Sequence, residues 1–284
     1  MEHFYIITNR DKDQELTVTG RIRDYLTGRG KQCTVKDRPF GGGDYSTDPA
    51  SIPDDVDCIL VLGGDGTMLQ AARDVAPRQI PILGINLGTL GYLAEIDMDN
   101  LENALEALLQ GSYVTEKRMM LQGTVMHADG SVDEDTALND IVITRSGNLR
   151  VILYEIYVNG QFLKGYSADG LILSTPTGST GYNMSAGGPI VEPSAELIML
   201  TPICPHTLNT RGIILSPQDE IEVKIGRGRD GANQEIMVNF DGGHAIGIRT
   251  GDRIRISRWE KYTNILKCNH MSFLEVLHRK MKDA

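Results

Sequence analysis

The sequence has few of the features that mark membrane, secreted or nucleic-acid-binding proteins. None of its apolar runs approaches the roughly 20 residues that a membrane-spanning helix needs, and its start, MEHFYIITNR, lacks the basic segment and apolar core of a signal peptide. Positive charge is scarce, with 28 Lys and Arg against 38 Asp and Glu and a formal net charge of −10. A surface of that sign repels nucleic acid and anionic membranes, so we expect neither as a partner.

Cysteine is also rare. The four cysteines are Cys33, Cys58, Cys204 and Cys268, and no two have the spacing of a metal-binding knuckle. Cys58 and Cys204 lie in apolar runs, which predicts buried, unreactive thiols. This usage is typical of a reducing compartment, so we expect a cytoplasmic protein.

Two common nucleotide-binding motifs are missing. The glycine-rich stretch FGGGDYST (40–47) lacks the Lys-Ser/Thr pair of a P-loop, and we expect it to be a surface loop. No G-x-G-x-x-G follows the first predicted strand, and no acidic residue is placed about 20 residues beyond such a loop. The missing G-x-G-x-x-G and the missing acidic residue argue against a dehydrogenase.

What the sequence does contain is a change of pattern near residue 112. Before it, apolar strands at 4–8, 57–64 and 80–85 alternate with helical patterns at 67–75 and 100–111. This alternation predicts an open α/β (Rossmann-like) domain over 1–113. After it, short strands with hairpin turns such as VNGQ predict a β-rich domain over 114–261. We expect the C-terminal segment, 262–284, to be a helix that packs back on the first domain through Phe273, Leu274, Leu277 and Met281.

The stretch ILVLGGDGTMLQAAR (59–73) places one carboxylate, Asp65, where a buried strand ends and a helix begins. In open α/β sheets this is where ligands bind. Gly63, Gly64 and Gly66 would let a ligand approach the backbone, whose amides can face phosphate oxygens. The alternative is that Asp65 or Thr67 merely caps the helix.

Two later segments carry further polar groups. Within the segment 168–189, residues 174–180 hold five hydroxyl side chains, which can form a cradle for sugar hydroxyls and phosphates or belong to a plain loop; they are Ser174, Thr175, Thr177, Ser179 and Thr180. In LNDIVI, Asn139 and Asp140 interrupt an apolar strand. Asn can pair with an adenine edge and Asp can accept from ribose hydroxyls, although a turn or bulge is the alternative.

Three other polar residues bear on the site. Arg211 is a candidate phosphate contact, His206 is expected to be a packed, hydrogen-bonded residue, and Asp241 is expected first as a hairpin-turn residue.

Together these segments closely resemble the NAD kinase family. The matching pieces run in the family's order from about residue 57 to the end: GGDGTMLQAAR, GINLGTLGYLAEI, LND, SADGLILSTPTGSTGYNMSAGGPIVEPS, PHTLNTRGIIL and SFLEVLHRKM. STPTGSTGYNMSAGGP is highly specific, whereas lipid kinases and phosphofructokinases share motifs like GGDGT. The resemblance implies an α/β domain followed by a β-sandwich-like domain, and a homodimer or homotetramer.

The resemblance also implies the reaction and the site. The γ-phosphoryl group of ATP would pass to the 2′-hydroxyl of the adenosine ribose of NAD, giving NADP and ADP, with Asp65 as general base. Gly64 and Gly66 would lie beside the substrate, and Asn139 and Asp140 would hold its adenosine half. The remaining implied NAD-pocket residues are Asp169, Thr177, Thr180, Gly181, Tyr182 and Ser185. At Gly181 the family commonly has alanine. Mg²⁺ with ATP would supply positive charge, through protein ligands that the sequence leaves unassigned.

Two other functions compete with this interpretation. Lipid kinases of the diacylglycerol or sphingosine type share GGDGT but follow it with Gly-Thr-x-Asn-Asp, where this chain has GINLGTLGYLAEI. A non-catalytic NAD-binding regulator is disfavoured because Asp65 is present. The sequence leaves open whether polyphosphate also serves as donor, whether NADH is accepted, and whether NADP or NADPH inhibits.

Overall fold

The chain divides into two compact units. The computed structural model describes residues 1–36, 46–89, 91–94, 96–147, 151–207, 210–269 and 271–282, so residues 40–45 of the FGGGDYST stretch lie outside the described residues. One unit comprises Met1–Arg118 with Lys261–Ala284, and the other comprises Met119–Glu260. The boundaries predicted from sequence fell after residues 113 and 261. Among the described helices, none has both the length and the apolar character to cross a membrane.

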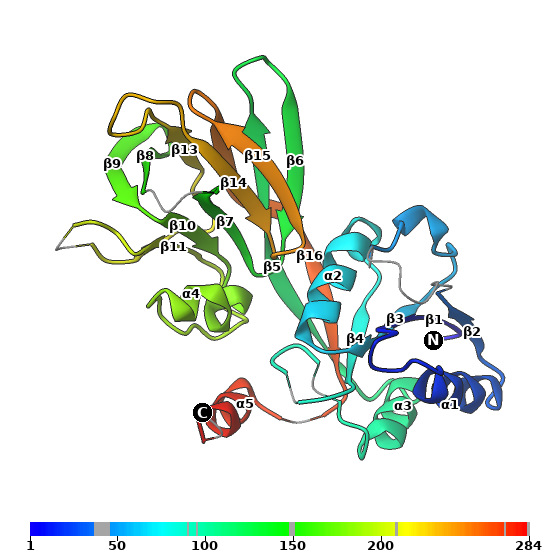
Figure 1. The fold of residues 1–284 in the computed structure, drawn as a ribbon. Coiled ribbons are helices and arrows are strands. Elements are labelled where there is room, and N and C mark those ends of the chain that lie inside the picture. Colours follow the sequence, from blue (N-terminus) through cyan, green and yellow to red (C-terminus); the bar gives the residue numbers. More distant parts are fainter. Residues whose placement is uncertain are drawn as a thin grey trace. The chain divides into compact units, whose positions relative to one another are not determined.

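The first unit is built on a parallel sheet (Figure 1). Its strands run in the order β2 (Gln32–Val35), β1 (His3–Thr8), β3 (Cys58–Gly63) and β4 (Ile82–Asn86), all parallel. The end of β16 (Arg253–Lys267) joins β4 in parallel, with Ile265 opposite Ile82. Every residue of β1, β3 and β4 is buried, as continuous apolar strands covered on both faces require.

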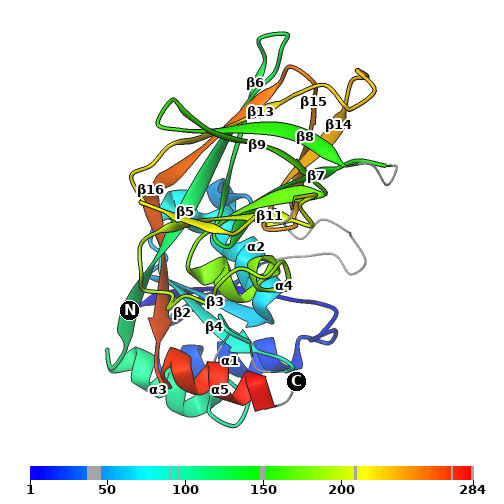
Figure 2. The same cartoon turned by 90° about the vertical axis from the view of Figure 1, so that its left-hand side faces the viewer.

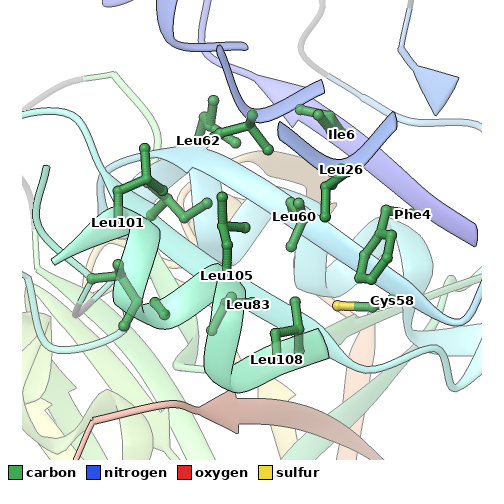
Figure 3. Close-up of a cluster of buried hydrophobic side chains, with 14 of the residues drawn as sticks. Phe4, Ile6, Leu26, Cys58, Leu60, Leu62, Leu83, Leu101, Leu105 and Leu108 are labelled. Carbon is green, nitrogen blue, oxygen red and sulfur yellow. The ribbon is translucent and has the colours of Figure 1, made fainter. Parts of the chain in front are cut away.

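Helices cover both faces of this sheet. α1 (Thr17–Thr27) and α3 (Leu101–Leu109) lie on one face, and α2 (Asp65–Val75) lies on the other (Figures 1 and 2). Figure 3 shows the hydrophobic cluster between the sheet and helices α1 and α3, where Leu26 of α1 and Leu105 of α3 pack with Phe4 and Leu60 of the strands. Short 3-10 turns lie at Pro49–Ser51 and Ala76–Arg78.

The second unit is all-β. One group of antiparallel strands follows the order β16, β13 (Ile221–Ile225), β8 (Ile152–Val158) and β9 (Gln161–Ala168), and β5 (Val114–Met126) pairs with β16 and with β6 (Val132–Ala137). A separate sheet has the order β12 (Ile213–Leu215), β11 (Ile198–Ile203), β10 (Gly170–Ser174), β7 (Asp140–Arg145), β14 (Glu235–Phe240) and β15 (His244–Arg249). After β10 come a 3-10 turn (Thr177–Thr180) and the short helix α4 (Tyr182–Ser185). The predicted fold class, α/β followed by all-β, is confirmed.

Three local expectations were wrong. The C-terminal segment is not helical from 262, because β16 continues to Lys267 and α5 spans only Phe273–Lys282. Its inward face is only partly the predicted one, since Phe273 and Leu277 are partly buried as expected, whereas Leu274 and Met281 are exposed and Val276 is buried. Cys204 is exposed, because β11 ends at Ile203 and the next residue turns the chain with a positive φ of 44°.

Candidate functional site

The turn between β3 and α2 places Asp65 at the edge of the parallel sheet where the strands end. Leu62 of β3 lies opposite Thr8 of β1, and Gly63 lies opposite Asn86 of β4, so the three strands end together. Asp65 is the first residue of α2 and is partly buried. Ligands of open α/β folds bind at this edge.

The Asp65 carboxylate is held by the loop after β4. Its Oδ2 accepts a hydrogen bond from the backbone N–H of Tyr92 at 2.8 Å, and its Oδ1 accepts from Leu93 at 3.0 Å and Ala94 at 3.2 Å. These partners lie outside α2, so the alternative in which Asp65 caps the helix is wrong. Thr67 is not a cap either, because its hydroxyl accepts from the Asn9 side chain at 3.1 Å.

The glycines around Asp65 have different functions. A Cβ at Gly91 would lie 1.9 Å from Asp65 Oδ1, so this glycine makes room for the carboxylate. A Cβ at Gly63 would lie 2.3 Å from Thr67 Oγ1, so Gly63 serves packing, contrary to the sequence-based expectation that it clears space for a ligand. Gly66 faces open space, and Gly64 is approached by the ammonium of Lys12.

A cavity of about 580 Å³ opens beside Asp65. Its wall comes entirely from the first unit: Ile7, Asn9, Asp11, Lys12, Gly64, Asp65, Gly66, Thr67, Gln70, Ala71, Thr89, Gly91 and Lys280. Four of these residues, Asn9, Asp11, Lys12 and Lys280, were not predicted from the sequence. The first three could have been found, because they follow β1, whose end meets the same edge of the sheet as the end of β3.

In the second unit, a different aspartate holds the Asn139–Asp140 segment. The Asp241 carboxylate accepts from the backbone N–H groups of Leu138 at 2.7 Å, Asn139 at 2.8 Å and Asp140 at 3.0 Å. Asp241 is also the turn residue that the sequence predicted, with a φ of 50° between β14 and β15. It therefore turns one hairpin and fixes the backbone of another segment.

This segment carries two unusual side chains. Asp140 is 6% exposed, and burial, with a smaller contribution from the negative charge of Asp241, raises its carboxyl pKa to about 7. The Oδ1 atom of Asn139 is buried and has no hydrogen-bond partner in the described part of the chain. Because buried acceptors are almost always satisfied, this oxygen is a candidate contact for a ligand donor.

The loop after β10 packs directly on Asn139 and Asp140. A Cβ at Gly178 would lie 2.2 Å from the Asn139 carbonyl oxygen. A Cβ at Gly181 would lie 3.4 Å from Asn139 Nδ2 and 3.7 Å from Asp140 Oδ2. These distances leave room for the methyl group of an alanine after a small shift. The structure therefore brings Asn139, Asp140 and Gly181 together.

Three of the five hydroxyl groups at residues 174–180 do not form an open cradle. Thr175 Oγ1 donates to the Leu138 carbonyl at 2.5 Å, Ser174 Oγ donates to the Asn139 carbonyl at 3.2 Å, and Ser179 Oγ bonds both backbone groups of Val191 at 3.0 Å. All three side chains are fully buried and shape the loop. Thr177 is 6% exposed, whereas Thr180 is partly buried and Tyr182 and Ser185 are exposed.

Asp169 and Arg211 lie apart from this group. Asp169 precedes β10 and pairs with Arg145 at 2.9 Å, whereas Ser174, at the other end of the strand, is opposite Asp140. Five residues of strand separate the two ends by roughly 16 Å, so within this chain Asp169 does not join Asn139 and Asp140. Arg211 is exposed just before β12. His206 was expected to be packed but is also exposed, and its backbone N–H donates to the Ser167 carbonyl at 2.8 Å.

Comparison with known proteins matches both units. The model of the ATP-NAD kinase N-terminal domain matches residues 4–113, and that of the ATP-NAD kinase C-terminal domain matches residues 138–268. The NAD kinase of Lachnoclostridium phytofermentans is 45% identical over 285 residues, which cover 100% of both chains.

Solved structures agree with these matches. An NAD kinase from Archaeoglobus fulgidus in complex with ATP is 25% identical, with a TM-score of 0.80 and 99% of each chain covered. Yeast NADH kinase complexed with NADH shares the fold, with a TM-score of 0.85 at 24% identity over 99% of this chain and 88% of that one. The chain therefore belongs to the NAD kinase family.

Proposed function

We propose that this protein is an NAD kinase, which transfers the γ-phosphoryl group of ATP to the 2′-hydroxyl of the adenosine ribose of NAD. The observation that carries the proposal is the placement of Asp65 in the wall of a 580 Å³ cavity, at the edge where the parallel strands end. The full-length similarity to NAD kinases supports the substrate assignment.

Asp65 is the proposed general base. Two carboxylate oxygens offer about four lone-pair sites, and backbone N–H groups use one on Oδ2 and two on Oδ1. The remaining site on Oδ2 can accept a hydrogen bond from the 2′-hydroxyl and take its proton. A carboxylate suffices because phosphoryl transfer has a loose transition state, in which positioning and charge neutralisation do most of the catalysis.

The second unit is proposed to bind the adenosine half of NAD. The unpaired Oδ1 of Asn139 suits an amino donor on the adenine edge. Ionised Asp140 can accept from ribose hydroxyls, and its pKa of about 7 means that it loses its proton near neutral pH. Thr180, Tyr182 and Ser185, whose side chains reach solvent, are the remaining proposed contacts on this unit.

Mg²⁺ fits this site as a companion of ATP rather than as a metal caged by protein. Across the described residues, no group of three His, Cys, Asp or Glu side chains could hold a metal. Mg²⁺ in such enzymes is bound by one or two carboxylates together with substrate phosphates, and the cavity offers Asp11 and Asp65. When bound, Mg²⁺ would neutralise phosphate charge.

A cytoplasmic homodimer or homotetramer is the proposed cellular form.

A coupled assay tests the function. Purified protein is incubated with NAD and Mg²⁺-ATP, and NADP is detected with an NADP-specific dehydrogenase. We expect NADP to form with ATP. Folded protein that produces none, with ATP or with polyphosphate, would overturn the proposal. Diacylglycerol or sphingosine phosphorylation would then become the leading alternative, followed by NAD binding without turnover.

A further inference from the structure

Two lysines face the cavity that contains Asp65, although the chain as a whole carries a net charge of −10. Lys12 comes from the loop between β1 and α1, and Lys280 comes from the last turns of α5. They reach the cavity from segments 268 positions apart in the sequence. Neither was identified from the sequence, and the proposed function has so far given neither a role.

The ammonium of Lys12 lies over the ends of two strands. A Cβ at Gly64 would be 3.1 Å from Lys12 Nζ, and a Cβ at Gly88 would be 3.2 Å from it. Any side chain at either position would crowd the ammonium. The two glycines therefore leave space for a cation beside the turn that carries Asp65.

The loop that carries Lys12 is firmly held. The backbone N–H groups of Lys12 and Asp13 both donate to the Asn9 carbonyl at 3.1 Å. The Asp13 carboxylate is buried and accepts from Thr19 N–H at 2.9 Å and Thr19 Oγ1 at 2.7 Å. Lys12 thus projects from a fixed turn, which reduces the entropy lost when its ammonium binds an anion.

Lys280 approaches from the inward face of α5. Phe273, Val276, Leu277 and Lys280 follow the spacing of one helical face, and all four are buried or partly buried. The Nζ atom of Lys280 lies 5.5 Å from the centre of the Tyr92 ring, and the Tyr92 N–H bonds Asp65. Lys280 therefore lines the cavity beside the loop that positions the proposed base.

Asp11 and Asp65 line the same cavity, but among the residues that the structure describes no ion pair joins Lys12 or Lys280 to a carboxylate. Ammonium groups are compact point charges that suit phosphate oxygens. We propose that Lys12 and Lys280 bind the phosphate chain of the phosphoryl donor within this cavity. The inference rests on the proposed function and deepens it, because it assigns the donor's cationic contacts and names a linear polyphosphate chain as the ligand class.

The first test measures binding without turnover. Inorganic triphosphate is titrated into wild-type protein and into Lys12→Ala and Lys280→Ala by calorimetry. Each variant is expected to weaken Kd roughly tenfold or more, the size of a lost charge-assisted hydrogen bond. Lys117→Ala and Lys282→Ala are matched controls, because these lysines are exposed, belong to the same unit and do not line the cavity. Unchanged affinity in both cavity variants would overturn the inference.

The second test separates phosphate binding from a structural role. In the coupled assay, both variants are expected to raise KM for ATP roughly tenfold or more while KM for NAD stays within about twofold. Lys12→Arg and Lys280→Arg, which keep the charge, should recover most of the affinity. A fall in kcat with KM for ATP unchanged would show that Lys280 acts only by supporting Tyr92, and would overturn its assignment.

The two proposals fail in different ways. If no NADP forms but the lysine variants lose triphosphate binding, the kinase proposal fails and the phosphate site stands. If NADP forms and the variants bind triphosphate like the wild type, the inference alone fails. ATP and inorganic polyphosphate present the same phosphate chain to the lysines. Replacing ATP by inorganic polyphosphate in the assay therefore shows which of these two compounds serves as the donor.

Discussion

Replacing Gly91 with alanine should inactivate the proposed enzyme without unfolding it. The new Cβ would lie 1.9 Å from Oδ1, 2.5 Å from Cγ and 2.8 Å from Oδ2 of Asp65. A methyl group cannot occupy that space, so the carboxylate must move by about 1 Å or more. Misplacement of a catalytic group by ~1 Å costs on the order of 100-fold in rate, which corresponds to about 2.7 kcal/mol in the activation free energy.

The same movement strains the three hydrogen bonds that the loop donates to Asp65. Hydrogen bonds to charged groups contribute about 1.5–3 kcal/mol each, and Asp65 can keep some of them after it rotates. We therefore expect a free energy of unfolding lower by about 1–3 kcal/mol, which leaves a typical domain folded.

The assay is kcat and KM for NAD at saturating Mg²⁺-ATP, together with urea unfolding. Gly20→Ala is the control, because Gly20 lies in α1, its Cβ would meet nothing within 4 Å, and alanine favours a helix. Near wild-type turnover in Gly91→Ala would refute the argument that this loop positions a catalytic carboxylate.

Three further predictions concern the aspartates. Asp65→Asn should lower kcat by at least about 100-fold with KM for NAD little changed, since the amide accepts no proton and its NH₂ opposes a backbone donor; near wild-type turnover would rule out Asp65 as the base. Asp241→Ala should raise KM for NAD roughly tenfold or more, because the backbone of Asn139 and Asp140 loses its acceptor; an unchanged KM would exclude that positioning. The pKa of Asp140 is raised to about 7, so the folded state binds more protons than the unfolded state between about pH 4 and pH 7. The free energy of unfolding should therefore fall as pH rises through that window, and urea titrations of Asp140→Asn should lose this slope; an equal slope in the variant would assign it to another group.

The sequence by itself determined the alternation of strands and helices, the change to a β-rich unit and the location of Asp65. These features are local, because a continuous apolar run followed by glycines and a helical pattern fixes a strand, a turn and a helix from neighbouring residues alone. The STPTGSTGY segment, with its resemblance to NAD kinases, also required no tertiary information. The extent of the C-terminal helix was less predictable, because β16 and α5 follow each other within one short segment.

Only the tertiary structure decided which polar groups are available. Asp65 takes its hydrogen bonds from residues 27 to 29 positions away, and Asp241 holds a segment 101 to 103 positions away. Likewise, Ser174 and Thr175 satisfy backbone carbonyls more than 30 positions distant, and Lys12 and Lys280 meet at one cavity. Sequence periodicity tells which face of an element is buried, whereas strand order and register decide which distant segments share an edge. The donor-side lysines and the positioning aspartate follow from that second kind of information.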